Sequence, residues 1–159
     1  MSPGDLAPSQ RHEARHSAEL MIAPDAAWQM IVDAKMIAAW YSFGGATIEP
    51  RVGGRFELCW DPGTVFRGRI TAIEEPHTLT YRLPQEPGIE LTASNSTQVT
   101  LTVSESAKNP GRAVVAVHEN GFESLDAKYS PSDAYRASQM AWIGALGLLV
   151  QSTGVPPQI

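Results

Sequence analysis

The chain has 159 residues, of which 43% are hydrophobic, and it carries a formal net charge of −5. A chain of this length buries enough apolar surface for one globular domain. The acidic balance argues against a nucleic-acid-binding surface, because phosphate contacts depend on clustered Lys and Arg. The only close arginine groups, Arg51 with Arg55 and Arg67 with Arg69, are typical of an exposed strand face.

Features of the whole chain indicate a cytoplasmic protein. Cys59 is the single cysteine, so no internal disulfide can form, which is compatible with a reducing compartment. The first residues lack the basic and apolar segments of a secretory signal. The most apolar stretch, residues 20–43, is interrupted by a proline and three charged residues, which excludes an ordinary membrane-spanning helix.

The sequence predicts one domain over residues 12–151. Residues 1–11 and 152–159 contain prolines and glycines and few apolar groups, so we expect flexible tails at both ends.

The first half of the domain predicts a strand followed by helix. Between residues 14 and 22 the apolar side chains occupy even positions, which is the pattern of a half-buried strand. Pro24 suits the first turn of a helix, where its missing N–H costs nothing. A helical apolar stripe follows, on one amphipathic helix or two short ones end to end, and we expect it to be core: Trp28, Ile31, Val32, Met36, Ala39 and Trp40.

The second half predicts short strands and then one long helix. Turn sequences separate the strands, so neighbours can only pair as antiparallel hairpins. A helix over residues 132–150 has Tyr135, Trp142, Leu146 and Leu149 on one face. The expected strands are 46–49, 54–60, 64–74, 78–83, 97–104 and 112–119.

Gly53 and Gly54 stand at the entry to a strand in "EPRVGGRFELCW". Glycines at this place predict a tight turn with positive φ or a bulge, either of which curls a sheet. Even residues of the strand then point inward. The positions that line the resulting concave face are Phe56, Leu58, Trp60, Phe66, Gly68, Ile70, Ala72, Leu79, Tyr81, Leu83, Val99, Leu101, Val103, Val115 and Val117.

Five segments carry a resemblance to a known family. They are "IAPDAAWQMIVDAKMIAAWY" (22–41), "EPRVGGRFELCW" (49–60), "FRGRITAIEEPHTLTYR" (66–82), "VHENGF" (117–122) and "AWIGALGLL" (141–149). Over about residues 20–150 the chain resembles the START-like (SRPBCC, helix-grip) superfamily. Within it, the chain is similar to the group related to the C-terminal domain of the activator of heat-shock-protein-90 ATPase.

The resemblance implies an α+β fold. It consists of a curved antiparallel sheet of about six or seven strands wrapped around a long C-terminal helix. One or two short helices follow the first strand, and a pocket lies between sheet and last helix. The superfamily includes lipid and hormone carriers, aromatic polyketide cyclases and co-chaperones, so the fold does not by itself define the function. The eukaryotic activator has a separate N-terminal domain that 159 residues cannot accommodate.

The segment "HEARH", His12 to His16, matches the H-E-x-x-H signature of zinc proteases. The signature requires a helix, whereas this segment continues into a run with strand alternation. On a strand the two histidines lie roughly 13 Å apart, too far to share a zinc. We therefore expect neither a metal site nor a cofactor.

Glu119 is the candidate polar group of the pocket. Alternation aligns it with Val115 and Val117 on the inner face and turns His118 outward. Related sequences often place a histidine where this chain has Glu119. A buried acid in an apolar cavity could act as a base or anchor a ligand. The alternative is a carboxylate at the strand end that reaches solvent or pairs with an arginine.

These observations favour the binding of a small aromatic, acyl or lipid-like ligand, without an evident catalytic apparatus. One alternative is a protein-binding module that modulates a heat-shock chaperone ATPase, and another is a polyketide-cyclase-like enzyme using Glu119 as acid and base. Neither nucleic acid nor a membrane is an expected partner, and a homodimer is left open. The candidate ligand-binding residues are Trp40, Phe56, Leu58, Trp60, Phe66, Ile70, Tyr81, Glu119, Tyr135 and Trp142.

Overall fold

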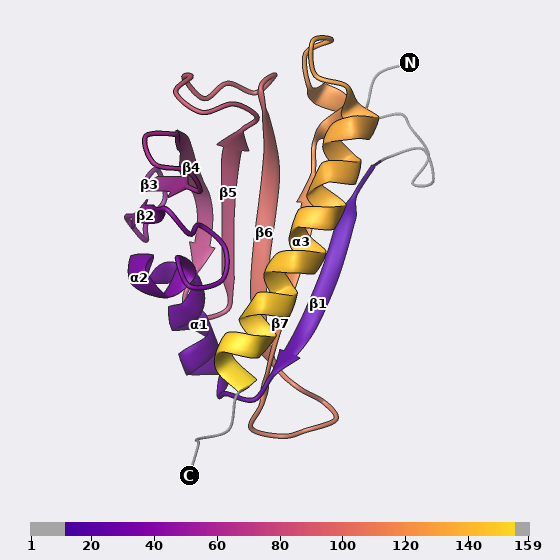
Figure 1. The fold of residues 1–159 in the computed structure, drawn as a ribbon. Helices are drawn as coiled ribbons and strands as arrows, with labels where there is room; N and C mark the ends of the chain where they lie inside the picture. The colour runs from indigo at the N-terminus through magenta and orange to yellow at the C-terminus, as the bar shows by residue number, and fades with distance from the viewer. Residues whose placement is uncertain (1–11, 155–159) are drawn as a thin grey trace.

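The computed structural model describes residues 12–154, which form an antiparallel sheet and three α-helices (Figure 1). The expected tail 1–11, and residues 155–159 of the expected tail 152–159, lie outside the described residues. The helical elements are α1 (Pro24–Val32), α2 (Ala34–Ile37), the short 3₁₀ helix η3 (Phe122–Ser124) and α3 (Pro131–Gly154). The strands are β1 (Ala14–Leu20), β2 (Gly45–Ile48), β3 (Arg55–Cys59), β4 (Val65–Glu74), β5 (Thr78–Pro84), β6 (Ser96–Glu105) and β7 (Ala113–Asn120).

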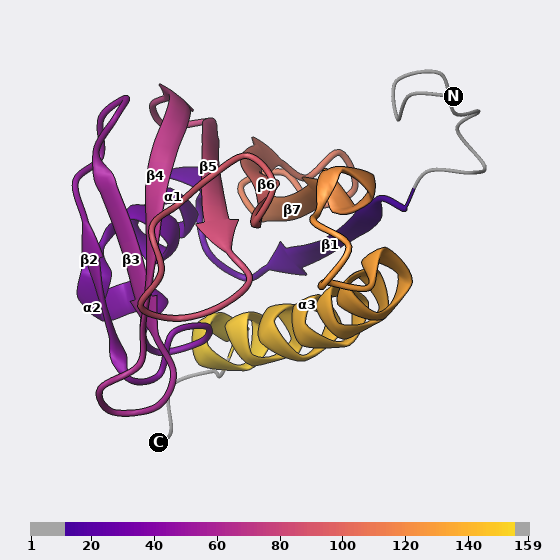
Figure 2. The same ribbon diagram turned by 90° about the horizontal axis from the view of Figure 1, so that it is seen from above.

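The seven strands form one sheet in the order β1-β7-β6-β5-β4-β3-β2, and every neighbouring pair is antiparallel. The sheet curls, and α3 lies across its concave side (Figure 2). Helix α3 contacts β1, α1 contacts β6 and β7, and α2 contacts β2. The α+β fold expected from the sequence, with its curved sheet and long last helix, is confirmed.

Two short helices follow β1 because Asp33 interrupts the helical backbone. Its φ of −88° and ψ of 125° are extended, and its side chain accepts hydrogen bonds from the N–H groups of Lys35 and Met36. The break changes the phase of the apolar stripe. Ile37 is therefore fully buried, whereas Met36, expected in the core, is 46% exposed.

The turn before β3 depends on both of its glycines. Gly53 has a φ of +79°, a conformation that L side chains rarely adopt. A Cβ on Gly54 would lie 2.0 Å from the Glu49 carbonyl oxygen. The Gly53 N–H bonds the Ile70 carbonyl over 2.8 Å, so the turn also joins β3 to β4. The predicted tight turn with positive φ is confirmed.

A bulge in β4 corrects one inward assignment. The register between β4 and β5 shifts between Ile70 and Ala72. Beyond the shift the alternation reverses, so Ala72 is exposed and Ile73 packs against the core instead.

The core fills the concave face with side chains from the sheet and the helices. Most positions expected to point inward are buried, among them Phe56, Leu58, Leu79 and Leu101. Helix α3 adds Trp142, Leu146 and Leu149, as expected. It continues to Gly154, beyond the expected end of the domain at residue 151.

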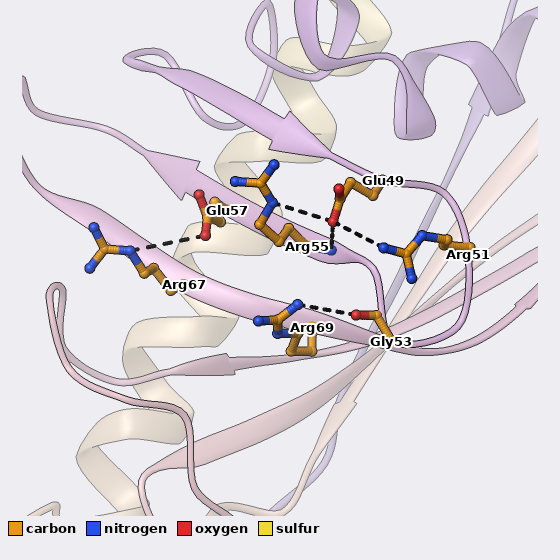
Figure 3. A network of polar contacts seen from close by, with 7 residues as sticks. All are labelled: Glu49, Arg51, Gly53, Arg55, Glu57, Arg67 and Arg69. Carbon is orange, nitrogen blue, oxygen red and sulfur yellow. Dashed lines mark hydrogen bonds and ion pairs between the residues drawn. The ribbon is translucent and has the colours of Figure 1, made fainter.

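The outer face of β3 and β4 carries paired charges (Figure 3). Glu49 contacts Arg55 at 3.3 Å and Arg51 at 3.7 Å, and Arg67 contacts Glu57 at 4.0 Å. Hydrogen bonds from the Arg55 backbone and side chain hold the pKa of the Glu49 carboxyl below its usual value. Arg55, Arg67 and Arg69 thus belong to an exposed strand face, as expected, whereas Arg51 lies in the turn before β3. Within residues 12–154, no helix is both long and apolar enough to cross a bilayer.

Candidate functional site

A cleft of about 320 Å³ opens between α3 and the strands opposite it. Four aromatic rings form much of its wall, and small side chains of α3 form one side. Its lining residues are Tyr41, Trp60, Phe66, Leu83, Pro84, Gln85, Thr97, Val99, Glu119, Ala134, Ala137, Ser138, Ala141 and Trp142. None of these side chains is cationic.

Glu119 lies at the buried side of this cleft and is 5% exposed. The Thr97 hydroxyl donates to one carboxyl oxygen over 2.6 Å, and the Trp142 indole N–H donates to the other over 2.8 Å. Burial raises the pKa of Glu119, and hydrogen bonds from Thr97, Trp142 and Ser138 act in the opposite direction. Burial is the larger influence, so the pKa of this carboxyl group lies above its ordinary value.

Strand alternation puts this carboxyl group inside. Glu119 follows Val115 and Val117 on the concave face of β7 and is paired with Val99 of β6. His118 faces outward, where its ring contacts Glu13 at 2.9 Å. The inward orientation predicted for Glu119 is confirmed. Among the described residues Glu119 has no ion-pair partner, so the alternative of a strand-end carboxylate in solvent or beside an arginine is wrong.

Two tyrosines sit next to Glu119. The Tyr41 ring stacks on Trp142 with 4.7 Å between centroids. The Tyr81 side chain is fully buried. Burial is the main cause that raises the pKa of both hydroxyls, and the nearby charge of Glu119 raises them further. Both tyrosines therefore stay protonated and can act as hydrogen-bond donors.

A second, more apolar groove of about 400 Å³ adjoins the cleft. Tyr41, Trp60 and Ala141 line both cavities and form the border between them. The groove is lined by Trp40, Tyr41, Phe43, Trp60, Met140, Ala141, Gly144, Ala145 and Leu148. It contains no charged side chain.

The structure brings together half of the residues proposed from the sequence. Trp60, Phe66, Glu119 and Trp142 line the cleft, and Trp40 lines the groove. The remaining candidates line neither cavity, namely Phe56, Leu58, Ile70, Tyr81 and Tyr135.

The other five candidates pack against neighbouring side chains away from the two cavities. Phe56, Leu58, Ile70 and Tyr81 belong to the packed core, with Phe56 stacked on Tyr81 at 4.0 Å. Tyr135, near the start of α3, packs edge-on against Phe122 at 5.7 Å. Sequence alternation identifies the inner face but does not distinguish its filled centre from its open rim.

Ten lining residues of the cleft were not among the candidates, and three of these ten interact with Glu119. Thr97 shares the alternation of Val99 and could have been found from it. Ser138 precedes Trp142 by one helical turn and so lies on the same face of α3. Tyr41 follows α2 in an irregular segment that has no periodicity to place its ring.

The H-E-x-x-H segment does not form the helix that zinc proteases need. His16 lies within β1, which begins at Ala14, and Glu13 precedes it in non-helical backbone. The His16 ring contacts Gln139 of α3. This segment therefore serves to hold the first strand against the last helix.

Residues 22–135 match the family model for Activator of Hsp90 ATPase homolog 1-like protein. The match runs from the end of β1 into the start of α3, and so includes all strands of the cleft. A search of curated proteins found no match.

Solved structures share the fold at low sequence identity. An HSP90 activator from Plasmodium falciparum has a TM-score of 0.68 and 18% identity, covering 92% of this chain and 99% of that one. The Aha1 dimer of Colwellia psychrerythraea has a TM-score of 0.69 and 11% identity, covering 90% and 96%. A Mesorhizobium loti protein has a TM-score of 0.69 and 20% identity, covering 87% and 94%. With the family match over residues 22–135, the chain belongs to the Activator of Hsp90 ATPase homolog 1-like family.

Proposed function

We propose that this protein binds a small, mainly apolar ligand in the cleft between α3 and the sheet. The observation that carries the proposal is the combination of aromatic walls with one buried carboxyl group, Glu119. Ligand sites in proteins are typically concave and apolar, with a few polar groups that fix orientation. The family match supports the fold that carries the cleft.

The volume limits the size of the ligand. A cleft of about 320 Å³ is at the lower end of the range of ligand sites. The centre of the concave face is filled by core side chains such as Phe56 and Tyr81. A compact aromatic or short acyl compound therefore suits the site better than a long-chain lipid, unless the body of the ligand extends into the adjoining groove.

Tryptophan fluorescence tests this proposal, because Trp60 and Trp142 line the cleft. A panel of aromatic and acyl compounds should give saturable changes in emission. Ala141→Phe should weaken binding, since Ala141 lies on the border of cleft and groove. Ala127→Phe makes the same change at an exposed position that lines neither cavity and should leave binding unchanged. Equal effects of the two variants, or no saturable change, would oppose the proposal.

A second candidate function is protein binding by the outer face of α3. No charged residue occurs from Ala137 to Gly154. On this face Met140 is 73% exposed, Ile143 58% and Val150 38%. Large exposed apolar surfaces without charge mark interaction sites in soluble proteins.

A second copy of the chain is the proposed occupant of this face. Met140, Ile143, Gly147 and Val150 alternate at spacings of three and four residues, the seam of a helix pair. If the α3 helices of two copies pack antiparallel about a two-fold axis near Ala145, the large Ile143 of one copy lies against the small Gly147 of the other. A heat-shock chaperone, which the family match suggests, is the competing occupant. An unchanged chaperone ATPase rate at excess protein would count against that competitor.

Acid–base catalysis at Glu119 is a third candidate. Its support is the buried carboxyl group with a raised pKa in an open cleft, a common feature of active sites. Glu119→Gln should then abolish turnover of the true substrate. The cleft offers no histidine, lysine or cysteine as a second catalytic group.

For location we propose the cytoplasm, which the single cysteine supports.

A further inference from the structure

Glu119 differs from the other carboxylates of the described chain in being both buried and bonded only to neutral partners. Glu19, Glu49 and Glu86 each contact an Arg or Lys side chain within 4 Å. The partners of Glu119 are the Thr97 hydroxyl, the Trp142 indole and the Ser138 hydroxyl, all of them neutral. It is also the only buried Asp, Glu, Lys, Arg or His residue within residues 12–154. The site therefore contains a carboxyl group without a counter-charge.

The hydrogen bonds of Glu119 suit the ionised form. An indole N–H can only donate, so the carboxyl oxygen bonded to Trp142 must act as an acceptor. The Thr97 hydroxyl donates to the other oxygen. Together the two oxygens retain lone pairs for a further donor. Burial opposes the ionisation of Glu119. A cation beside the carboxylate would offset the free-energy cost of burying its charge.

Aromatic rings surround the space in front of this carboxyl group. Tyr41 stacks on Trp142 at 4.7 Å and meets Trp60 edge-on at 5.0 Å. Trp60 meets Phe66 edge-on at 5.5 Å. Tyr41 also stacks on Trp40 at 5.5 Å, so its two faces are covered. The rings of the cleft wall that remain to attract a cation through a negative face are Trp60, Phe66 and Trp142. An aromatic enclosure with one carboxylate is the chemistry that recognises an ammonium group.

Nothing in the lining repels a cation. Neither the cleft nor the adjoining groove contains Lys, Arg or His. The other titratable groups near Glu119 are Tyr41 and Tyr81, which burial keeps neutral. The apolar groove beyond Tyr41 and Trp60 leaves space for an uncharged ligand body.

We propose that the ligand of the cleft is a small amine with an apolar body, whose protonated nitrogen pairs with Glu119 inside the ring of Tyr41, Trp60, Phe66 and Trp142. The inference rests on the proposed function, because it specifies the ligand class for the same site. It differs from the general expectation of an aromatic, acyl or lipid-like ligand, which needs no positive charge.

Three probes with one shared phenylbutyl body test this inference: phenylbutylamine, phenylbutanol and phenylpentanoate. They differ only in a cationic, neutral or anionic head group and do not absorb where tryptophan is excited selectively. Each is titrated into the full chain while tryptophan emission is followed. We expect the amine to bind at least about tenfold more tightly than the alcohol, and the carboxylate to bind most weakly.

Glu119→Gln is the matched variant, because the glutamine carbonyl oxygen can still accept from Trp142 and its NH2 group can donate to the Thr97 hydroxyl oxygen. It should weaken amine binding by about tenfold and leave alcohol binding within about twofold. With the natural chain, amine affinity should fall as the pH is lowered until Glu119 is protonated, whereas alcohol affinity should not. This pH series needs no substitution and stands even if the variant does not fold.

The outcomes separate the two proposals. If the alcohol binds as well as the amine, or if amine binding does not depend on pH and Glu119, the amine inference is wrong and ligand binding stands. If none of the three probes binds, both are wrong.

Discussion

The indole N–H of Trp142 donates to the Glu119 carboxyl group over 2.8 Å, which joins α3 to β7 at the buried side of the cleft. The same bond fixes the carboxyl group where ligand and helix meet. The position of α3 on the sheet and the polarity of the cleft thus depend on one contact. We expect changes at either residue to affect both stability and binding.

Trp142→Phe should destabilise the fold more than Trp28→Phe does. Both residues are buried, at 1% and 2% exposure, and both substitutions remove the same part of the ring. The Trp28 indole N–H has no hydrogen-bond partner among residues 12–154, whereas removing that of Trp142 leaves a buried carboxyl oxygen with one donor fewer. The extra loss should be about 1–2 kcal/mol in the free energy of unfolding. Urea unfolding measures it, and equal losses would show that the bond to Glu119 contributes nothing.

The stability of the Glu119→Gln variant should change with pH relative to the natural chain. Burial raises the Glu119 pKa above its ordinary value of 4.5, so the folded protein holds this proton more tightly than the unfolded chain. The stabilisation that the group gives is complete below pH 4.5 and is lost as the pH rises through the folded pKa. Glutamine does not titrate, so the variant should gain relative stability over this range.

Urea unfolding of both proteins across the acidic to neutral range measures this difference. Hydrogen bonds and basic partners lower the pKa of Glu19, Glu49 and Glu86, so their contributions run in the opposite direction. They are common to both proteins and cancel in the comparison. A difference that is constant with pH, or that grows in favour of the natural chain, would contradict a raised pKa.

The glycine pair before β3 should show two different sensitivities. The Cβ added by Gly53→Ala would face open space, so only the φ of +79° opposes this substitution. The free energy of unfolding should fall by about 1–2 kcal/mol. Gly54→Ala would place a Cβ 2.0 Å from the Glu49 carbonyl oxygen, so the backbone of the turn must move. The second variant should therefore be clearly less stable in thermal unfolding. A smaller loss for Gly54→Ala than for Gly53→Ala would contradict this turn geometry.

Ile143→Lys should prevent self-association through α3. Ile143 is 58% exposed on an uncharged helix face, so the substitution places a charge in the proposed seam without affecting the core. Analytical ultracentrifugation of the natural chain should show a dimer whose fraction rises with concentration, and the variant should remain monomeric. Ala127→Lys adds the same charge at an exposed position away from α3 and should leave the dimer intact. A natural chain that is monomeric at every concentration would refute the proposed interface.

The fold was largely predictable because its patterns are local. Alternation in β3 and β7, and the turn sequences between strands, placed every strand near its observed bounds. Errors arose where a short irregularity reverses a pattern. Asp33 resets the helical phase so that Ile37 replaces Met36 in the core, and the bulge after Ile70 turns Ala72 outward.

The site was only partly predictable, for a geometrical reason. Phe56 and Trp60 share the same alternation in and just beyond β3, yet Phe56 is buried in the core and Trp60 borders the cleft. Where the cleft opens is decided by how α3 crosses the strands. That crossing depends on long-range contacts, including the one between Trp142 and Glu119, which no sequence period reveals.

The most direct test of ligand binding between α3 and the sheet is an NMR titration that follows the indole N–H signals of the four tryptophans. Phenylbutylamine is a suitable probe. The signals of Trp142 and Trp60 should shift and saturate together, while that of Trp28, buried in α1 away from the cleft, should not move. Saturable shifts that spare Trp142 and Trp60, or the absence of any saturable shift, would contradict the account.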